Sequence, residues 1–574
     1  MDRAHRLVVV GAAPLIAAHR PGPETDPARL DRHASDVDVL HAPRAQRGTY
    51  QSSPRQGASD RDRSRPLATT SAAGRRAGAA RHLATWRCGR ALRRRECARR
   101  VHGRSVMIER ILLLGASGDL TSRLLMPAIA ELAEAELLPA GLRIVGSARR
   151  PWSTADFREH IATQLERHSK VAPATRDDVV RCLEYEPADV TRAEDVRRLV
   201  GGPERPGTLV YLALAPALIE PVLHALASAA LGARDAVAIE KPFGVDLASA
   251  RRLNGVLRCE LPEPSIFRID HFLSDELVRR VTALRFLNRI FEPVWNAVHV
   301  ERVEISWLES LTLEGRAGYY DQAGALRDMV QSHLMEVMAL VVMEPPSRAD
   351  AASYRAARLE ALRAVATPSL DEIRSRTLRA RYTAGAIGTR RVPSYVDEPG
   401  VDPRRDTETY ASLTLGIETM RWSGVPFTLR SGKAFATSAA EIAIHFRALP
   451  RYVRDTWPGV EPNTLRLGLT EPYVRVATTL DGPDGVAESR ALELCASPPR
   501  RSVYANLMLD MLRGDPALFI LGEEAEEAWR VIDPVIDAWH AGEVPMREYA
   551  AGASAPPSAE RRRPTSIGAT PQAP

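Results

Sequence analysis

The order of apolar and polar positions divides the chain into two regions. Between residues 108 and 270, short apolar runs at 111–114, 143–146, 209–213 and 236–239 alternate with longer amphipathic segments such as 124–138. Buried strands that alternate with helix-length segments are typical of a parallel sheet with crossover helices. We therefore predict an α/β domain over residues 107–270.

Beyond residue 290 the pattern changes to strands of alternating apolar and polar residues. Such runs cover 299–306, 409–418, 441–446 and 464–469, and long helical segments such as 324–342 separate them. This pattern indicates an α+β domain. Residues 271–550 are predicted to form it, around a large, mainly antiparallel sheet.

Residues 1–106 lack a sustained apolar period and are rich in Arg, Ala, Pro, Ser and Gly. They hold 22 arginines against nine acidic residues, so they account for more than the whole formal charge of +6. We expect this extension and the tail 551–574 to be disordered. A basic arm for nucleic acid is the alternative, but aromatic residues are sparse there. Translation that starts at Met107 explains the composition more simply, and no nucleic-acid partner is expected.

Cysteine spacing and hydropathy indicate the cellular compartment in which the protein functions. The five cysteines form no CxxC pair, which argues against a disulfide framework and against a zinc site, so no metal is expected. The longest apolar stretch, 209–232, contains two prolines, Glu220 and His224. It is better explained as a strand and a helix than as a membrane span. We expect a cytoplasmic protein without a membrane segment.

Lysine is rare, with three residues among 78 basic ones. Lys241 follows the predicted strand 236–239. Lys433 is the last residue of a turn predicted over residues 425–433, and Lys170 is predicted to lie in a polar helix. A compact ammonium suits a close-fitting polar site differently from a planar guanidinium. Chance placement on the surface is the alternative for each lysine.

The first predicted strand runs into a glycine-containing turn and then a helix. In Gly115-Ala-Ser-Gly-Asp-Leu-Thr121 two glycines permit a tight turn, and the amides at the helix start would face an anion such as phosphate. The spacing differs from the common G-x-G-x-x-G. The second strand ends in Gly146-Ser-Ala-Arg-Arg150, and arginines there favour a ribose 2′-phosphate. Two solvated arginines are the alternative.

Histidine and carboxylate residues form a second group of candidates. They occur in Arg268-Ile-Asp-His-Phe-Leu-Ser-Asp-Glu276 and Asp328-Met-Val-Gln-Ser-His333. A hydroxyl that loses a hydride needs a base for its proton, and a histidine with a pKa of about 6.5 suits this role. A carboxylate on the far ring nitrogen would fix the tautomer. The alternatives are a core histidine at 333 and an interdomain pair at 270 and 271.

Five sequence blocks give the chain a resemblance to the glucose-6-phosphate dehydrogenase family. In order they are GASGDL, EKPFG, RIDHF, RAGYYDQAGALRDMVQSH with MEPP after it, and VPFTLRSGK, and the resemblance covers residues 108–550. It implies a Rossmann-like NADP-binding domain followed by the α+β domain. It further implies oxidation of glucose 6-phosphate at C1 to the lactone, the first step of the oxidative pentose phosphate pathway. A homodimer or homotetramer formed through the second sheet is also implied.

The resemblance also implies roles for individual residues. His333 is expected to be the general base and Asp270 its carboxylate partner. The sugar phosphate is expected to contact Lys241, His271, Glu309, Asp328 and Lys433. The dinucleotide is expected to contact Gly115, Ala116, Ser117, Gly118, Asp119, Leu120, Arg149 and Lys241.

Several positions depart from the family pattern, and three of them lose a cation. The family's motif usually reads RIDHYLGKE, whereas residues 268–276 of this chain read RIDHFLSDE, with Asp275 in place of a phosphate-binding lysine. The family's lysine of the first helix and its basic residue five places after the glycine–lysine turn are replaced by Leu124 and Ser438. Three further changes are Phe272 for tyrosine, Ser274 for glycine and Ser332 for asparagine.

These losses leave three explanations open. One is that arginines of the following helix replace the lost lysines, namely Arg279, Arg280 or Arg285. Another is a different sugar or sugar phosphate as the substrate. The third is a regulatory paralogue that binds NADP without efficient turnover.

Overall fold

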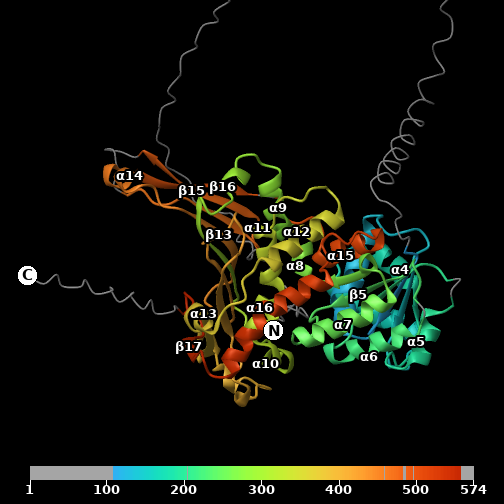
Figure 1. Ribbon diagram of the computed structural model, residues 1–574. Coiled ribbons are helices and arrows are strands. Elements are labelled where there is room, and N and C mark those ends of the chain that lie inside the picture. The colour runs from blue at the N-terminus through green and yellow to red at the C-terminus, as the bar shows by residue number, and fades with distance from the viewer. Residues whose placement is uncertain are drawn as a thin grey trace, which may run out of the picture. The chain divides into compact units, whose positions relative to one another are not determined.

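The computed structural model describes residues 108–557, except 203–204, 230, 458, 482–486 and 496 (Figure 1). The predictions for residues 1–106, for Met107 and for residues 558–574 lie outside this part of the chain. Residues 551–553 are described, and their carbonyls accept hydrogen bonds from the amides of Ala386 and Ala436. The chain therefore stays hydrogen-bonded beyond residue 550, where the sequence predicts a disordered tail.

Six parallel strands form the sheet of the first domain. Their spatial order is β3-β2-β1-β4-β5-β6, which confirms the predicted Rossmann-like architecture. The strand order reverses between β1 and β4, and a crevice for ligands is expected outside the carboxyl ends of the strands at such a point. The elements are β1 (Arg110–Leu114), η1 (Thr121–Leu125), α2 (Met126–Glu134), β2 (Arg143–Ser147), α3 (Thr154–His168), α4 (Pro173–Arg181), β3 (Leu183–Tyr185), α5 (Ala193–Val200), β4 (Thr208–Leu212), α6 (Pro216–Ala227), β5 (Ala236–Glu240), α7 (Leu247–Glu260), η2 (Glu263–Ser265) and β6 (Ile266–Ile269).

Helices cover both faces of this sheet (Figure 1). Ile111 and Leu113 pack toward α2, α3 and α15 (Val503–Arg513), whereas Leu112 and Leu114 pack toward α5 and α6. Successive residues of a strand point to opposite faces, so the continuous apolar run of β1 fits a strand that is buried on both sides. Helix α15 comes from near the end of the chain, and the sequence does not predict its place in the first core.

The second domain contains a nine-stranded sheet in the order β16-β15-β14-β13-β7-β12-β11-β8-β17. Its neighbours are antiparallel except β7 with β12 and β8 with β17, which confirms a mainly antiparallel sheet. Its strands, with the small pair β9–β10, are β7 (Val300–Leu308), β8 (Thr377–Thr383), β9 (Gly385–Ile387), β10 (Arg390–Val392), β11 (Tyr410–Leu415), β12 (Phe427–Gly432), β13 (Ala439–Phe446), β14 (Thr464–Gly468), β15 (Tyr473–Asp481), β16 (Ala487–Cys495) and β17 (Met546–Ala550). Block 425–433, which the sequence suggests is a turn, is mostly strand β12.

A long buried helical segment packs on this sheet. It runs through α10 (Ala317–Ala325), the π-helical η4 (Leu326–Leu334) and α11 (Met335–Val342), and every residue of α11 is buried. Asp328 and His333 therefore lie on a helix inside the largest apolar core. The other helices are α8 (His271–Ser274), α9 (Glu276–Phe286), η3 (Glu292–Val294), α12 (Ala351–Arg363), α13 (Leu370–Arg376), η5 (Tyr395–Asp397), η6 (Pro403–Arg405), α14 (Arg451–Thr456) and α16 (Gly522–His540).

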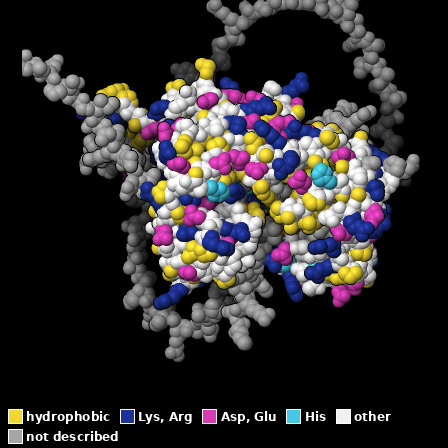
Figure 2. All heavy atoms as spheres, turned by 60° about the horizontal axis from the view of Figure 1, so that its bottom comes forward, with side chains coloured by type: hydrophobic (Ala, Val, Ile, Leu, Met, Phe, Trp, Pro, Cys, Tyr) yellow, Lys and Arg dark blue, Asp and Glu magenta, His cyan; other side chains and the backbone are white. Residues whose placement is uncertain are grey.

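Many of the arginines form ion pairs that hold the fold together. Figure 2 shows basic and acidic side chains interspersed over the face that it draws. Inside the protein, Arg358 pairs with Glu524, and neither side chain is exposed. A planar guanidinium suits such bidentate structural pairs. Lys241 and Lys433 also pair with acids, but these pairs lie in the site described next.

Candidate active site

The carboxyl ends of four parallel strands bring predicted site residues to one edge of the first sheet. Strand β1 leads into Gly115, β2 leads toward Arg149, β5 is followed by Lys241, and β6 is followed by Asp270. Parallel strands end at the same edge, which is where ligands bind in such sheets. The helix η4 adds Asp328 and His333 to this edge, because each is hydrogen-bonded to a residue that follows a strand.

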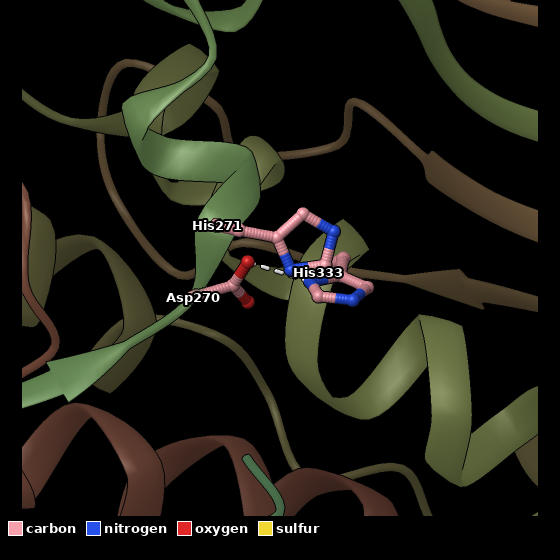
Figure 3. A group of neighbouring side chains, drawn as sticks. All are labelled: Asp270, His271 and His333. Atoms are coloured by element: carbon pink, nitrogen blue, oxygen red, sulfur yellow. Dashed lines mark hydrogen bonds and ion pairs between the residues drawn. The ribbon is translucent and has the colours of Figure 1, made fainter. Parts of the chain in front are cut away.

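Asp270 and His333 form a buried dyad, which Figure 3 shows together with His271. The Nδ1 atom of His333 lies 2.6 Å from Oδ1 of Asp270, and neither side chain is exposed. The same carboxylate oxygen accepts the amide of Phe272 at 3.0 Å and so caps α8. The cap and the histidine bond together fix the orientation of the carboxylate.

The protonation of the dyad follows from its burial. Burial lowers the pKa of His333, and the negative charge of Asp270 offsets this only in part. Burial alone would raise the pKa of Asp270, but the charge and the hydrogen bond of His333 hold it at about 2. Since an ionised carboxylate only accepts hydrogen bonds, the proton of the neutral imidazole is on Nδ1. Nε2 is the basic nitrogen, and no described residue hydrogen-bonds to it.

Two further rings enclose the imidazole of His333. The Phe272 ring is stacked on it, with centroids 4.0 Å apart and planes at 10°, and the His271 ring meets it edge-on at 4.7 Å. The phenyl ring has no hydroxyl, so it desolvates one face of the base without a hydrogen bond. Phe272, where the resemblance leads us to expect a tyrosine, thus gives the imidazole an apolar neighbour.

Lys241 and Asp328 form a second buried pair. The lysine Nζ donates to Oδ1 of Asp328 at 2.9 Å and to its backbone carbonyl at 2.8 Å. Burial alone would lower the pKa of Lys241, but the charge of Asp328 reverses this and raises it. Burial would likewise raise the pKa of Asp328, yet Lys241 and Lys433 hold it well below its usual value. Both side chains are therefore charged at neutral pH.

Lys433 and Glu309 form a third charged pair at the ends of β12 and β7. The lysine Nζ is an ion-pair partner of the Glu309 carboxylate and lies 5.1 Å from the ring centroid of Tyr320. The Trp307 indole also donates to Glu309, at 3.4 Å. Glu309, Asp328, Lys241 and Lys433 thus provide fixed donors and acceptors of the kind that sugar hydroxyls require.

The glycine turn after β1 is held close to the neighbouring strands. Gly115 has φ +94°, and a Cβ there would lie 2.1 Å from the Ala213 carbonyl oxygen, so only glycine fits. The amides of Gly115 and Ala116 donate to the Ser147 carbonyl at 2.9 and 3.0 Å. The helix that begins at Asp119 has no earlier carbonyls for its first amides, and such amides are suited to bind phosphate.

Two exposed arginines follow β2. This strand lies next to β1, so the arginines are near the glycine turn that follows β1. Arg149 and Arg150 are both exposed, and the Arg150 guanidinium lies 5.0 Å from the ring centroid of Trp152. Arg150 is thus held against an aromatic ring. Among the described residues no aromatic ring is recorded against the exposed side chain of Arg149.

The three residues that replace the cations expected from the family resemblance have structural roles of their own. Asp275 caps α9 by accepting the Leu277 amide at 2.8 Å, and burial raises the pKa of its carboxyl to about 6. The Ser438 hydroxyl accepts the Ser310 amide at 2.9 Å. Leu124 packs against the core of the first domain.

One of the arginines suggested as a replacement is excluded by the structure. Arg285 is fully buried and donates to the carbonyls of Leu340, Val341 and Met343. Its guanidinium is committed to the protein interior and cannot reach a substrate. Arg280 donates to the Ser497 carbonyl, and Arg279 lies exposed on the same helix.

Asp270, His271 and His333 offer ligand atoms within 4.8 Å of one another, the spacing of a metal site. Because Asp270 and His333 are already hydrogen-bonded to each other, a metal ion would have to replace that bond. The geometry fits a base with its carboxylate partner directly, without an ion.

Sequence reasoning did not single out Tyr319 and Gln331. The Tyr319 hydroxyl donates to Oδ1 of Asp328 at 3.3 Å, next to Lys241. Gln331 is only 7% exposed although it is polar. Both lie in the long block 316–333, and the only signal for them was their place in it.

Comparisons with known proteins cover both domains. The family description "Glucose-6-phosphate dehydrogenase, NAD binding domain" matches residues 112–280, and "Glucose-6-phosphate dehydrogenase, C-terminal domain" matches residues 282–564. The glucose-6-phosphate 1-dehydrogenase of Treponema pallidum is 35% identical over 480 residues, which are 78% of this chain and 92% of that protein. Glucose-6-phosphate 1-dehydrogenase 2 of Mycobacterium tuberculosis is 36% identical over 483 residues, 78% of this chain and 91% of that protein.

Two solved structures are also similar to this chain. A glucose-6-phosphate dehydrogenase in complex with its substrate glucose 6-phosphate has a TM-score of 0.71 at 27% identity, covering 79% of this chain and 97% of its own. The glucose-6-phosphate 1-dehydrogenase of Mycobacterium avium has a TM-score of 0.69 at 30% identity, and the match covers 78% of this chain and 94% of that protein's chain. Within the described residues no helix has the length and apolarity to cross a membrane. With both domains matched and relatives covered over nine-tenths of their length, this chain belongs to the glucose-6-phosphate dehydrogenase family.

Proposed function

We propose that this protein oxidises glucose 6-phosphate at C1 to the lactone with NADP as the cofactor, in the cytoplasm. The observation that carries the proposal is the buried Asp270–His333 dyad at the carboxyl edge of a dinucleotide-binding sheet. Relatives with the same two domains are glucose-6-phosphate 1-dehydrogenases. Formation of NADPH by the purified protein with glucose 6-phosphate tests the proposal.

His333 acts as the general base. Its Nε2 is unprotonated and accepts the proton of the C1 hydroxyl. Asp270 keeps the ring in the correct tautomer and stabilises the imidazolium that forms. The nicotinamide of bound NADP would supply the acceptor for the C1 hydrogen and its electron pair. Burial of the dyad lowers the pKa of His333, which keeps the base unprotonated at neutral pH.

The charged pairs hold the sugar phosphate beside the dyad. Lys241, Asp328, Glu309 and Lys433 are partly committed to one another, so substrate hydroxyls would join pairs that are already oriented. This pre-organisation limits the ordering cost of binding. We also assign His271 to the sugar phosphate, because its ring lies next to that of His333.

The first sheet fits the cofactor at both of its phosphate positions. The Gly115 turn and the first helical amides suit the pyrophosphate, with Ala116, Ser117, Gly118, Asp119 and Leu120 lining that turn. The exposed Arg149 suits a ribose 2′-phosphate, because no carboxylate follows β2 at this point. Lys241 would contact both ligands.

Arg149 should decide the choice between NADP and NAD. Arg149→Ala removes the cation that would pair with the 2′-phosphate, a charged hydrogen bond worth about 1.5–3 kcal/mol. We therefore expect kcat/KM for NADP to fall about 10- to 100-fold, with kcat/KM for NAD unchanged. Steady-state rates with each cofactor measure the ratio. The control is Arg143→Ala, which removes an exposed arginine of β2 that is paired with Glu184 on β3. An equal loss for both cofactors in Arg149→Ala would refute the role of Arg149.

Asp275 stands at the position of the family's phosphate-binding lysine, and its negative charge should weaken phosphate binding. Its substitution by asparagine preserves the cap of α9, since both residues serve as caps, whereas lysine removes the cap and adds a cation. If the phosphate lies here, Asp275→Lys lowers the KM for glucose 6-phosphate about tenfold relative to Asp275→Asn. Steady-state kinetics with glucose as a phosphate-free control give the comparison. Equal KM values in the two variants would place the phosphate elsewhere.

A different sugar or sugar phosphate is the second candidate, and the loss of cations at Leu124, Asp275 and Ser438 favours it. A panel of sugars and sugar 6-phosphates, followed by NADPH absorbance, separates the two. Binding of NADP without turnover on any of them would instead indicate a regulatory paralogue.

We further propose that the protein is a homodimer or homotetramer formed through the nine-stranded sheet. Leu480, Leu492 and Leu494 on β15 and β16 are more than half exposed. Large exposed apolar side chains on neighbouring strands are typical of a contact surface.

A further inference from the structure

A cavity of about 1280 Å³ adjoins the candidate active site. Its wall includes Ala215 and Pro216, which follow β4, and Pro242, which follows Lys241 after β5. The cavity therefore begins at the carboxyl edge of the parallel sheet. Arg327 and Gln331 of η4 also line it, so the helix that carries Asp328 and His333 forms part of the same wall.

Gln331 is a polar side chain in this wall that has no hydrogen-bond partner among the described residues. It is 7% exposed, and no hydrogen bond joins its amide to any of the described residues. Its amide is not among the fully buried polar atoms that lack a partner, so it reaches the space of the cavity, where a ligand can meet its donor and its acceptor. Arg327 and Gln331 are four positions apart and share one side of the helix. Asp328 and His333 are instead bonded to Lys241 and Asp270.

The position of the cavity indicates which part of the cofactor would meet Gln331. In a sheet of this order the dinucleotide lies across the point where the strand order reverses, with one half over each set of strands. The adenosine half belongs to the side of β2, where Arg149 follows the strand. The nicotinamide half then lies over β4 and β5, whose following residues line the cavity.

The chemistry of the side chain matches that half. Nicotinamide carries a primary carboxamide, which has one carbonyl acceptor and one NH₂ donor. The glutamine side chain has the same two groups, so the two amides can exchange a pair of hydrogen bonds. The oxygens of an ionised phosphodiester only accept hydrogen bonds, so they would satisfy the NH₂ group of Gln331 and leave its carbonyl oxygen without a donor.

We propose that the side-chain amide of Gln331 binds the carboxamide of the nicotinamide and fixes the orientation of the ring beside His333. This inference rests on the proposed function, because it takes NADP as the cofactor. It gives the helix η4 two tasks, with Asp328 and His333 serving the sugar and Gln331 serving the cofactor.

Equilibrium binding tests the proposal without turnover. Isothermal titration calorimetry would compare NADP with 2′-phospho-ADP-ribose, which lacks only the nicotinamide, on the wild-type protein and on Gln331→Leu. We expect the Kd for NADP to rise about tenfold, the effect of losing a hydrogen bond of about 1.4 kcal/mol. The Kd for 2′-phospho-ADP-ribose should not change.

Gln322→Leu is the matched control. Gln322 lines the same cavity, but it is exposed and its amide already donates to the Gly318 carbonyl at 2.8 Å. This variant should bind both ligands as the wild type does. Gln331→Glu, which keeps the size and loses the NH₂ donor, should also weaken NADP alone and serves if the leucine variant does not fold.

Two results would overturn the proposal. One is an unchanged Kd for NADP in both Gln331 variants, and the other is an equal weakening of NADP and of 2′-phospho-ADP-ribose. Failure of the proposed function has a different signature. In that case the wild-type protein would form no NADPH with glucose 6-phosphate, although the binding difference between the two ligands could still depend on Gln331.

Discussion

His333→Asn should lower kcat with glucose 6-phosphate about 100- to 10,000-fold, the usual contribution of a positioned general base. An asparagine amide can still hydrogen-bond to Asp270, but it cannot accept the proton of the C1 hydroxyl. The KM should change much less, because the charged pairs around Lys241 and Lys433 remain. Steady-state NADPH formation measures both parameters.

The pH profile supports or contradicts this assignment independently. In the wild-type protein kcat should fall in acid as His333 becomes protonated. Burial lowers the pKa of this histidine, so the fall should lie below the ordinary value of about 6.5. The residual activity of His333→Asn should lack this acid limb. The control is His445→Asn, which changes a buried histidine on β13 that is hydrogen-bonded to Arg302 on β7. Near-normal kcat in His333→Asn would exclude a role of His333 as the base.

Lys241→Met should lower both stability and activity. Removing one partner of a buried ion pair costs about 3–5 kcal/mol, because it leaves the other charge uncompensated, and here the side chain of Asp328 is only 2% exposed. The loss of a charged hydrogen bond to substrate should lower kcat/KM about 10- to 100-fold. Urea unfolding and steady-state kinetics measure the two effects.

A double variant separates them. Lys241→Met with Asp328→Asn removes both charges, so it should recover much of the stability without recovering activity. If the double variant is as unstable as Lys241→Met, the loss comes from packing and not from charge. Lys170→Met changes the one exposed lysine and should affect neither property.

The ion pair also makes stability depend on pH in a defined direction. The pKa of Asp328 is lower in the folded protein than in the unfolded chain. Its stabilising contribution is therefore complete above the unfolded value of about 4 and is lost as the pH falls below it. This acid sensitivity should be weaker in Lys241→Met.

The sequence predicts the individual strands well where apolar runs are short and clearly bounded. The runs 111–114 and 236–239 correspond to β1 and β5 within one residue at each end. Local periodicity determines such elements, since a strand buried on both faces needs a continuous apolar run. The order of the strands in space depends on long-range pairing, and it became clear only in the structure.

The site shows the same division between local and distant information. Asp270 and His333 are 63 residues apart, and Lys241 and Asp328 are 87 apart, so their pairing has no local signal. The sequence identified these residues through their chemistry and their motifs. It did not identify the cap formed by Asp275 or the buried position of Arg285, because both depend on how α9 packs.

The return of α15 to the first domain has a consequence for the newly made protein. Residues 504–512 complete one face of the parallel sheet, although the strands of that sheet end at Ile269. A ribosome therefore synthesises more than two hundred residues between the last strand and the helix that covers it. During that interval the nascent dinucleotide-binding domain exposes an apolar face, and chaperones that recognise such surfaces have their longest opportunity to bind it.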